Sequence, residues 1–186
     1  MDDRRLPGEH KFARPEWERR FLLARLPENE RIVRVRQIVD RYFDGTTLRL
    51  RRRQDSDGKL AFRLTQKLPQ GARDAFQGLI TTIELAEQEY DILASLPSRV
   101  LIKTRYSVPP FGIDVFEGEL SGLVMAEAEF ESLEQAAALR LPPFLTGEVS
   151  TDPRFTGARL AAATRQELKE WLAEFGLVPS YSRSRD

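Results

Sequence analysis

The regular alternation of charged and apolar residues is the feature that most constrains the fold. Residues 46–53 and 59–67 alternate apolar with basic side chains, and the five residues between them end in Gly58. Successive side chains of a strand point to opposite faces, so this period of two predicts a β-hairpin with its charges on one face. The Asp-Ser-Asp-Gly of the loop lacks the spaced ligands and closing Glu of a calcium loop, which favours a simple turn.

The same period recurs along most of the chain. We expect further strands at 14–24, 79–85, 99–108, 112–118 and 123–130, and a short one at 148–150. Apolar residues at helical spacing, or segments that end at prolines, predict helices at 86–96, 131–140 and 155–175. Mostly antiparallel strands with a few helices define an α+β protein.

Composition excludes several classes of protein. The 186 residues contain no cysteine and one histidine, His10, so thiolate zinc sites, disulfide scaffolds and Ser-His triads are excluded. The 29 basic and 29 acidic residues cancel, which argues against a nucleic-acid partner. No apolar run approaches the ~20 residues of a membrane span, and the first residues lack a signal-peptide core. We therefore expect a cytoplasmic protein with no membrane partner.

Length and patterning predict one domain at residues 13–176. Residues 1–12 are charged and aperiodic, and we expect them to form a flexible lead. Residues 177–186 are expected to be a disordered tail.

The charged faces of the expected strands are segregated by sign. Basic side chains two residues apart occur within 49–53, 63–67 and 103–105, and acidic pairs occur at 16–18 and 127–129. An ordinary solvated sheet face would also alternate. Arginine predominates here, however, and its planar fork suits phosphate groups. Adjacent carboxylates repel unless a cation lies between them, and such oxygen pairs select a hard divalent ion. The pattern therefore predicts a site for a metal and a polyphosphate.

At this point the chain resembles the CYTH domain, or triphosphate tunnel metalloenzyme, family over about residues 13–163. The family's N-terminal Glu-x-Glu-x-Lys strand corresponds to Glu16-Trp-Glu18-Arg-Arg20. Further landmarks follow in the family's order: Arg41-Tyr42-Phe43, Leu48-Arg49-Leu50-Arg51, Thr65-Gln-Lys67, Lys103-Thr-Arg105-Tyr106, Ile113-Asp114-Val-Phe116, Gly122-Leu123, Ala126-Glu127-Ala-Glu129 and Gly147-Glu148-Val149-Ser150.

The resemblance implies an eight-stranded antiparallel β-barrel that forms a tunnel, with helices packed outside and charged residues facing inward. Enzymes of this family act on triphosphates with a divalent metal, here Mg²⁺ or Mn²⁺. The implied catalytic residues are Glu16, Glu18 and Arg20. The implied phosphate ligands are Arg49, Arg51, Arg63, Lys67, Lys103 and Arg105. The implied metal ligands are Glu16, Glu18, Glu84, Glu127, Glu129 and Glu148, and Asp114 is expected to orient Arg105 or Lys103.

Three positions depart from the family's pattern, one of them Gly157, where many relatives have asparagine. Arg20 replaces the lysine of the first motif, and it keeps the charge but cannot donate a proton near neutral pH. Only Glu84 remains of a Glu-x-Glu pair that often precedes the first helix. These changes predict weakened turnover with phosphate binding intact.

The sequence predicts a hydrolase that cleaves the terminal phosphoanhydride of a triphosphate. No motif recognises a nucleobase, which favours inorganic triphosphate as the substrate. Two alternatives remain open: the same enzyme acting on ATP or thiamine triphosphate, and a non-catalytic binder of polyphosphate or nucleotide. The oligomeric state, monomer or homodimer, is left open by the sequence.

Overall fold

A computed structural model describes residues 12–68 and 76–179. Residues 1–11 of the expected flexible lead and most of the expected tail lie outside the described residues. The domain prediction therefore stays an expectation at both ends of the chain.

Within residues 12–68 and 76–179, nine strands make up the sheet, and all of their pairings are antiparallel. In chain order they are β1 (Arg14–Leu23), β2 (Arg34–Tyr42), β3 (Leu48–Asp55), β4 (Leu60–Leu68), β5 (Phe76–Leu85), β6 (Arg99–Val108), β7 (Phe111–Phe116), β8 (Val124–Phe130) and β9 (Gly147–Glu148). The helices are α1 (Glu87–Ala94), α2 (Leu133–Ala137), α3 (Gly157–Leu160) and α4 (Arg165–Ala173), with 3₁₀ turns at Gly118–Leu120 and Pro153–Phe155.

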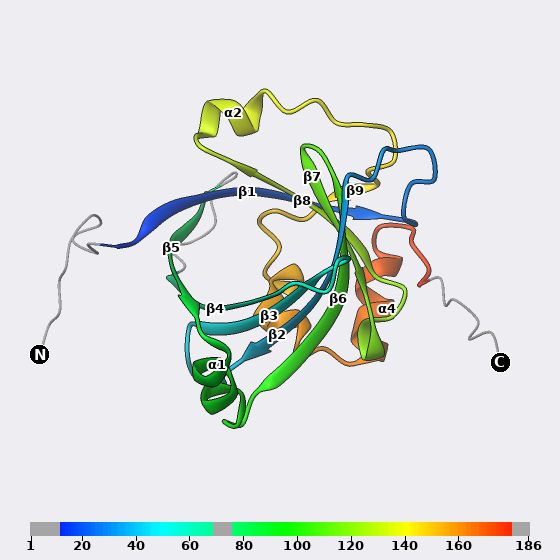
Figure 1. Ribbon diagram of the computed structural model, residues 1–186. Coiled ribbons are helices and arrows are strands. Elements are labelled where there is room, and N and C mark those ends of the chain that lie inside the picture. Colours follow the sequence, from blue (N-terminus) through cyan, green and yellow to red (C-terminus); the bar gives the residue numbers. More distant parts are fainter. Residues whose placement is uncertain (1–11, 69–75, 180–186) are drawn as a thin grey trace, which may run out of the picture.

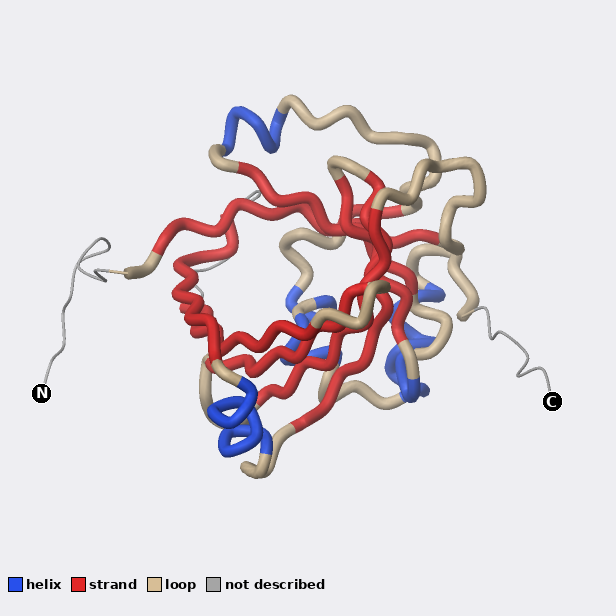
Figure 2. The backbone as a smooth tube through the Cα atoms, viewed as in Figure 1, coloured by secondary structure: helices blue, strands red, loops and turns tan. Residues whose placement is uncertain are grey.

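The first eight strands close into a barrel, which confirms the expected fold. Their order is β5-β4-β3-β2-β6-β7-β8-β1, and β1 pairs back with β5 through residues 14–17. Figures 1 and 2 look along the barrel and show the ring of strands with α1, α2 and α4 outside it, whereas α3 lines the cavity. The second half of β1 pairs instead with the short β9. One strand therefore joins both edges of the sheet.

The alternation of charged and apolar residues does not predict strand β2, because neither of its two faces is uniformly polar or apolar. Its register places Arg36, Ile38 and Asp40 on the face shared with the inward residues of β3 and β6. The other face carries valine, glutamine and arginine. Because polar and apolar residues occur on both faces, β2 has no clear period of two.

Apolar residues on the outer face of the barrel are covered by two separate elements. Helix α1 places Tyr90 over Leu50 and Phe62. The segment after β8 places Phe144 over Phe111, which also contacts Phe21 edge-on. Both covers follow from the alternation that puts the charges inside and the apolar residues outside.

The expected helix at 155–175 is interrupted, and that prediction was wrong in its extent. A 3₁₀ turn, α3 and α4 replace it, and Thr164 starts α4 with a capping box to Glu167. Leu168 and Leu172 of α4 pack with Leu22 of β1 in the largest apolar core. Since Leu22 follows Arg20 by two residues, this core continues the inward face of β1 beyond the charged residues. No helix within the described ranges is long and apolar enough to cross a membrane.

We predict that Leu168→Ala destabilises the protein by about 2–5 kcal/mol, because Leu168 is only 1% exposed and its removal leaves a cavity. Ile92→Ala, at a residue 71% exposed on α1, is the matched control and should change stability by less than about 0.5 kcal/mol. Denaturant unfolding measures both. Equal stability of the two variants would contradict the packing of α4 against the barrel.

Candidate active site in the barrel

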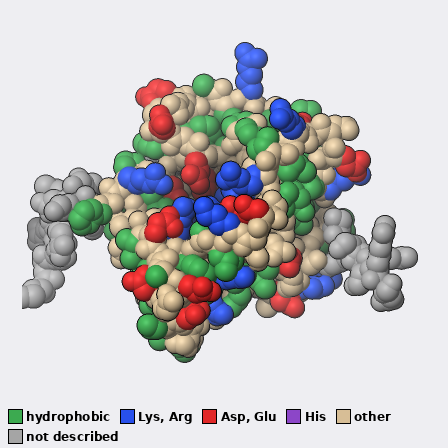
Figure 3. Space-filling view, viewed as in Figure 1, with side chains coloured by type: hydrophobic (Ala, Val, Ile, Leu, Met, Phe, Trp, Pro, Cys, Tyr) green, Lys and Arg blue, Asp and Glu red, His purple; other side chains and the backbone are tan. Residues whose placement is uncertain are grey.

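The barrel encloses a cavity of about 890 Å³, within the size range of small-molecule sites. Nine basic and six acidic side chains line it. Figure 3 shows Lys, Arg, Asp and Glu side chains gathered near the middle of the face seen along the barrel. The cavity lining includes these residues from the sequence prediction: Glu16, Glu18, Arg20, Arg49, Arg51, Arg63, Lys67, Lys103, Arg105, Glu127 and Glu129.

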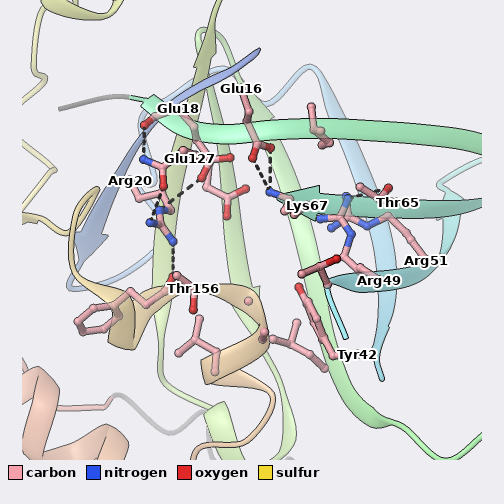
Figure 4. A pocket seen from close by; sticks show the side chains of 18 of the residues that line it. Glu16, Glu18, Arg20, Tyr42, Arg49, Arg51, Thr65, Lys67, Glu127 and Thr156 are labelled. Carbon is pink, nitrogen blue, oxygen red and sulfur yellow. Dashed lines mark hydrogen bonds and ion pairs between the residues drawn. The ribbon is translucent and has the colours of Figure 1, made fainter. Parts of the chain in front are cut away.

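Charge is segregated by wall. In the pairing of β1 with β8, Glu18 lies directly opposite Glu129, and Arg20 lies opposite Glu127. Figure 4 shows Glu18 and Glu127, with Arg20 beside them, at one side of the cavity and Arg49 and Arg51 at the other. Glu16 is joined to Lys67 between these two groups. The acidic wall therefore comes from β1 and β8, and the basic wall from β3 and β4.

A buried carboxylate on the strand next to β3 binds the basic wall. Asp40 on β2 is fully buried, and it accepts two hydrogen bonds from Arg51, at 2.6 Å from Nε and 2.7 Å from Nη2. Burial opposes ionisation of Asp40, but the charge and hydrogen bonds of Arg51 outweigh it and hold the pKa well below its usual range. Asp40 therefore stays charged and fixes the direction of Arg51.

Asp114 on β7 does the same for β6. Its side chain is fully buried and accepts hydrogen bonds from Lys103 Nζ and from both Nε and Nη2 of Arg105, the latter two at 2.6 Å. Arg105 also donates to Glu127 on β8, and its side chain passes over Gly112 of the intervening strand β7. This geometry is the one expected if Asp114 orients the two basic side chains rather than binding metal.

The acidic wall is electrostatically strained. Burial raises the pKa of Glu18 to about 7, and repulsion by Glu127 and Glu16 adds to this, while Lys67 and Arg20 oppose it. Glu127 itself is kept ionised, with a pKa well below its usual range, because Lys103 and Arg105 outweigh its burial. Directly opposed carboxylates such as Glu18 and Glu129 destabilise a sheet unless a cation lies between them.

These oxygen-only donors fit a hard divalent cation. Within the residues that the structure describes, no three acidic side chains are already grouped as a metal site. The reason is that Glu16 binds Lys67 at 2.8 and 3.0 Å and Glu127 binds Arg105. The carboxylates and the basic residues thus satisfy one another.

Arg20 is held by the backbone. Its Nη1 donates to the Phe155 carbonyl at 2.8 Å, and its Nη2 donates to the Ser150 carbonyl at 2.7 Å and to Gln77 Oε1 at 3.1 Å. Its Nε lies 3.4 Å from Glu18. The side chain is 6% exposed. Arg20 therefore ties β1 to the segment at 150–155 that forms part of the cavity wall, and few of its donors remain for a phosphate.

Two predicted metal ligands lie apart from the others. Glu148 on β9 accepts hydrogen bonds from Arg19, at 2.9 and 2.6 Å, and from Ser150 Oγ. Arg19 has the parity opposite to that of Glu18 and Arg20, so this pair lies on the outer side of β1. Glu84 pairs with Arg63 at 2.7 Å and is 64% exposed. Neither carboxylate lines the cavity, so a shared metal site with Glu16 and Glu18 does not follow from this structure.

Sequence reasoning missed several residues of the site. Asp40 was missed because β2 was missed, although an acidic residue two positions before Tyr42 was the available signal. Gln77 bridges Arg20 and the Ser150 carbonyl, and no spacing marked it. Tyr42 lines the cavity beside Gly157, where an added Cβ would lie 2.0 Å from the Tyr42 hydroxyl. Only glycine allows α3 to approach so closely.

A closed barrel with an acidic wall opposite a basic wall defines a tunnel-type protein that binds a polyanion together with a cation. The chain is 33% identical over 163 residues to an inorganic triphosphatase of Nitrosomonas europaea, with 78% of this chain and 96% of the relative covered. It therefore belongs to the CYTH family of triphosphate tunnel metalloenzymes, and membership implies a requirement for a divalent metal. No protein-family model matches the chain.

Solved structures agree with this assignment. The crystal structure of the inorganic triphosphatase NE1496 matches with a TM-score of 0.52 and 29% identity, over 80% of this chain and 95% of that one. A crystal structure described as the hypothetical protein NE1496 matches with a TM-score of 0.53 and 30% identity, over 80% and 99%.

The raised pKa of Glu18 predicts a pH-dependent stability of the metal-free protein. A carboxyl whose pKa is higher folded than unfolded stabilises the fold fully below about pH 4.5, and that contribution is lost as pH rises through about 7. Melting temperatures in the presence of a chelator should therefore fall between pH 5 and 8, and Glu18→Gln should flatten this fall. Glu119→Gln, at an exposed residue, is the control and should retain the wild-type profile. An unchanged profile in Glu18→Gln would contradict the strained acidic wall.

The contacts of Arg20 predict a structural role. Arg20→Ala removes the Arg20 donor from the buried Phe155 carbonyl and leaves the Ser150 carbonyl with Gln77 alone, so it should destabilise the protein by about 1–3 kcal/mol. Arg20→Lys keeps the charge but cannot reach both carbonyls and Gln77 at once, so it should recover only part of that loss. Denaturant unfolding measures the two variants. Full wild-type stability in Arg20→Ala would show that the 150–155 segment does not depend on this side chain.

Proposed function

We propose that the protein is a metal-dependent triphosphatase that cleaves the terminal phosphoanhydride of a triphosphate, with inorganic triphosphate as the preferred substrate. The observation that carries the proposal is the opposition of the acidic β1–β8 wall and the basic β3–β4 wall inside the cavity of one closed barrel. The similarity to an inorganic triphosphatase supports the choice of substrate.

The carboxylates that would hold a Mg²⁺ or Mn²⁺ ion are those of the acidic wall: Glu16, Glu18, Glu127 and Glu129. Bound there, the ion would neutralise charge on the phosphate oxygens. Glu84 and Glu148 are not included, because they lie outside the cavity.

The basic residues bind and orient the phosphate chain. Arg49 is best placed for this: its Nε lies 4.0 Å from Asp40, it makes no hydrogen bond from that atom, and Nη2 reaches Thr65 only at 3.4 Å. Arg51, Lys103 and Arg105 are held in direction by Asp40 and Asp114, so they present preorganised donors. When the Lys67 ammonium group donates to a phosphate oxygen instead of to Glu16, the Glu16 carboxylate becomes available to the cation.

A second candidate, a non-catalytic polyphosphate binder, is favoured by one observation. Arg20 stands where the family has lysine, and its donors are engaged by carbonyls and Gln77. If the family's lysine takes part in the chemistry, this chain retains binding and loses turnover.

The test is release of orthophosphate from inorganic triphosphate, ATP and thiamine triphosphate, each with Mg²⁺ or Mn²⁺. We expect the highest kcat/KM with inorganic triphosphate. Release with none of them, together with thermal stabilisation by triphosphate, would establish the binder. A higher kcat/KM with a nucleotide would overturn the substrate assignment.

Arg49→Gln should weaken the use of triphosphate by about 1.5–3 kcal/mol, the value of a hydrogen bond to a charged group, which corresponds to roughly a 10- to 150-fold fall in kcat/KM. Arg52→Gln is the matched control, because Arg52 is on the same strand but has the parity of Leu50, on the outer face. Equal losses in both variants would show that the effect of Arg49 is not a contact inside the cavity.

A further inference from the structure

A second group of arginines lies at the end of the inward faces of β2 and β3. It consists of Arg34, Arg36 and Arg53 with one carboxylate, Asp55, and we call it the arginine cluster. Arg36 lies opposite Asp55 in the pairing of β2 with β3. None of the four residues lines the large cavity. The proposed reaction therefore makes no use of them.

The cluster has an excess of positive charge. Arg36 Nε and Arg53 Nε each lie 3.4 Å from the same Asp55 oxygen, and neither contact is a hydrogen bond. Both Nε atoms and that oxygen are buried without a hydrogen-bond partner among the described residues. Two guanidinium groups share the Asp55 carboxylate, and Arg34 adds a third positive charge near Arg36, so the four residues carry a net charge of two.

The neighbouring groups do not remove this excess. Burial lowers the pKa of Arg36, and repulsion by Arg34 and Arg53 lowers it further. Arg105 on β6 lies opposite Arg36, but it is itself positively charged. The two carboxylates that Arg105 binds, Asp114 and Glu127, are already paired with it. The only hydrogen bond given by the Arg36 side chain to a described residue is a long one of 3.4 Å to Ser107 Oγ.

The cluster remains open to solvent. The side chains of Arg36 and Arg53 are 20% and 24% exposed, and Arg34 is exposed. An oxyanion can therefore reach the guanidinium groups from outside. Arg105, which lines the cavity, lies opposite Arg36 in the pairing of β6 with β2, so the cluster adjoins the end of the cavity.

We propose that Arg34, Arg36 and Arg53 form a second oxyanion site that binds one doubly charged phosphate group. Two excess positive charges match the charge of such a group, and guanidinium forks give it short, charge-assisted hydrogen bonds. The group comes from free orthophosphate or from the end of a linear polyphosphate longer than three units that extends past Arg105. Only the choice between these sources rests on the proposed function, since anion binding itself does not require hydrolysis.

The experiment measures orthophosphate binding by calorimetry with metal and triphosphate absent. Wild type and Arg52→Gln, on the outer face of the same strand, should bind equally. The double variant Arg36→Gln with Arg53→Gln should bind at least about tenfold more weakly. Asp55→Asn, which removes the only carboxylate of the cluster, should bind more tightly than wild type. Equal affinity in all four proteins would overturn the proposal.

Two controls separate this result from the main site. Arg49→Gln, in the cavity, should lower orthophosphate affinity by less than the double variant does, and a loss as large as that of the double variant would place the phosphate in the cavity and overturn the proposal. Triphosphate hydrolysis, measured in parallel, tests the proposed function independently. If the double variant does not fold by circular dichroism, Arg53→Gln alone is measured, with the same direction expected.

Binding of linear phosphates of different lengths distinguishes the two sources of the phosphate group. If a long chain extends to the cluster, the double variant should weaken binding of linear tetraphosphate more than binding of triphosphate. If the site takes free orthophosphate, both should change equally while orthophosphate binding falls.

Discussion

The interaction on which the structure depends is the pairing of buried carboxylates with the basic side chains of the barrel wall. Asp40 neutralises Arg51, and Asp114 neutralises Lys103 and Arg105. A buried charge without a partner is strongly destabilising, so neither set of basic residues could face a closed interior alone. The two aspartates make a lumen of arginine and lysine compatible with folding. They also fix the direction of those side chains before any ligand arrives.

The two walls are compensated to different degrees. The basic residues are paired with buried aspartates on neighbouring strands. The acidic wall depends instead on hydrogen bonds from basic side chains that line the cavity, such as Lys67 to Glu16. Glu18 is left partly uncompensated, which is why its pKa rises to about 7. A divalent cation would relieve that repulsion and free Lys67 for phosphate. Metal and polyanion binding should therefore strengthen each other.

The departures from the family's pattern have physical consequences. Arg20 gains contacts that a lysine could not make together, and it joins β1 to the segment at 150–155. The same contacts occupy the charge that the family's lysine would offer to the reaction. Glu84 is bound to Arg63 at the rim, and Glu148 to Arg19 outside. The acidic set available to a cation is thus smaller than the sequence suggested.

Sequence alone determined the strands whose charges and apolar residues alternate cleanly, and with them the inward position of residues such as Arg49 and Glu127. Alternation assigns a face because side-chain direction has a period of two. It could not identify β2, whose two faces are both mixed, and so it missed Asp40. The family resemblance placed Glu148 with the metal ligands. Local spacing cannot show that β9 pairs with β1 or that Glu148 binds Arg19 on the outer side of that strand. Those contacts join residues more than 100 positions apart, as in Arg19 with Glu148, and only the closed barrel brings them together.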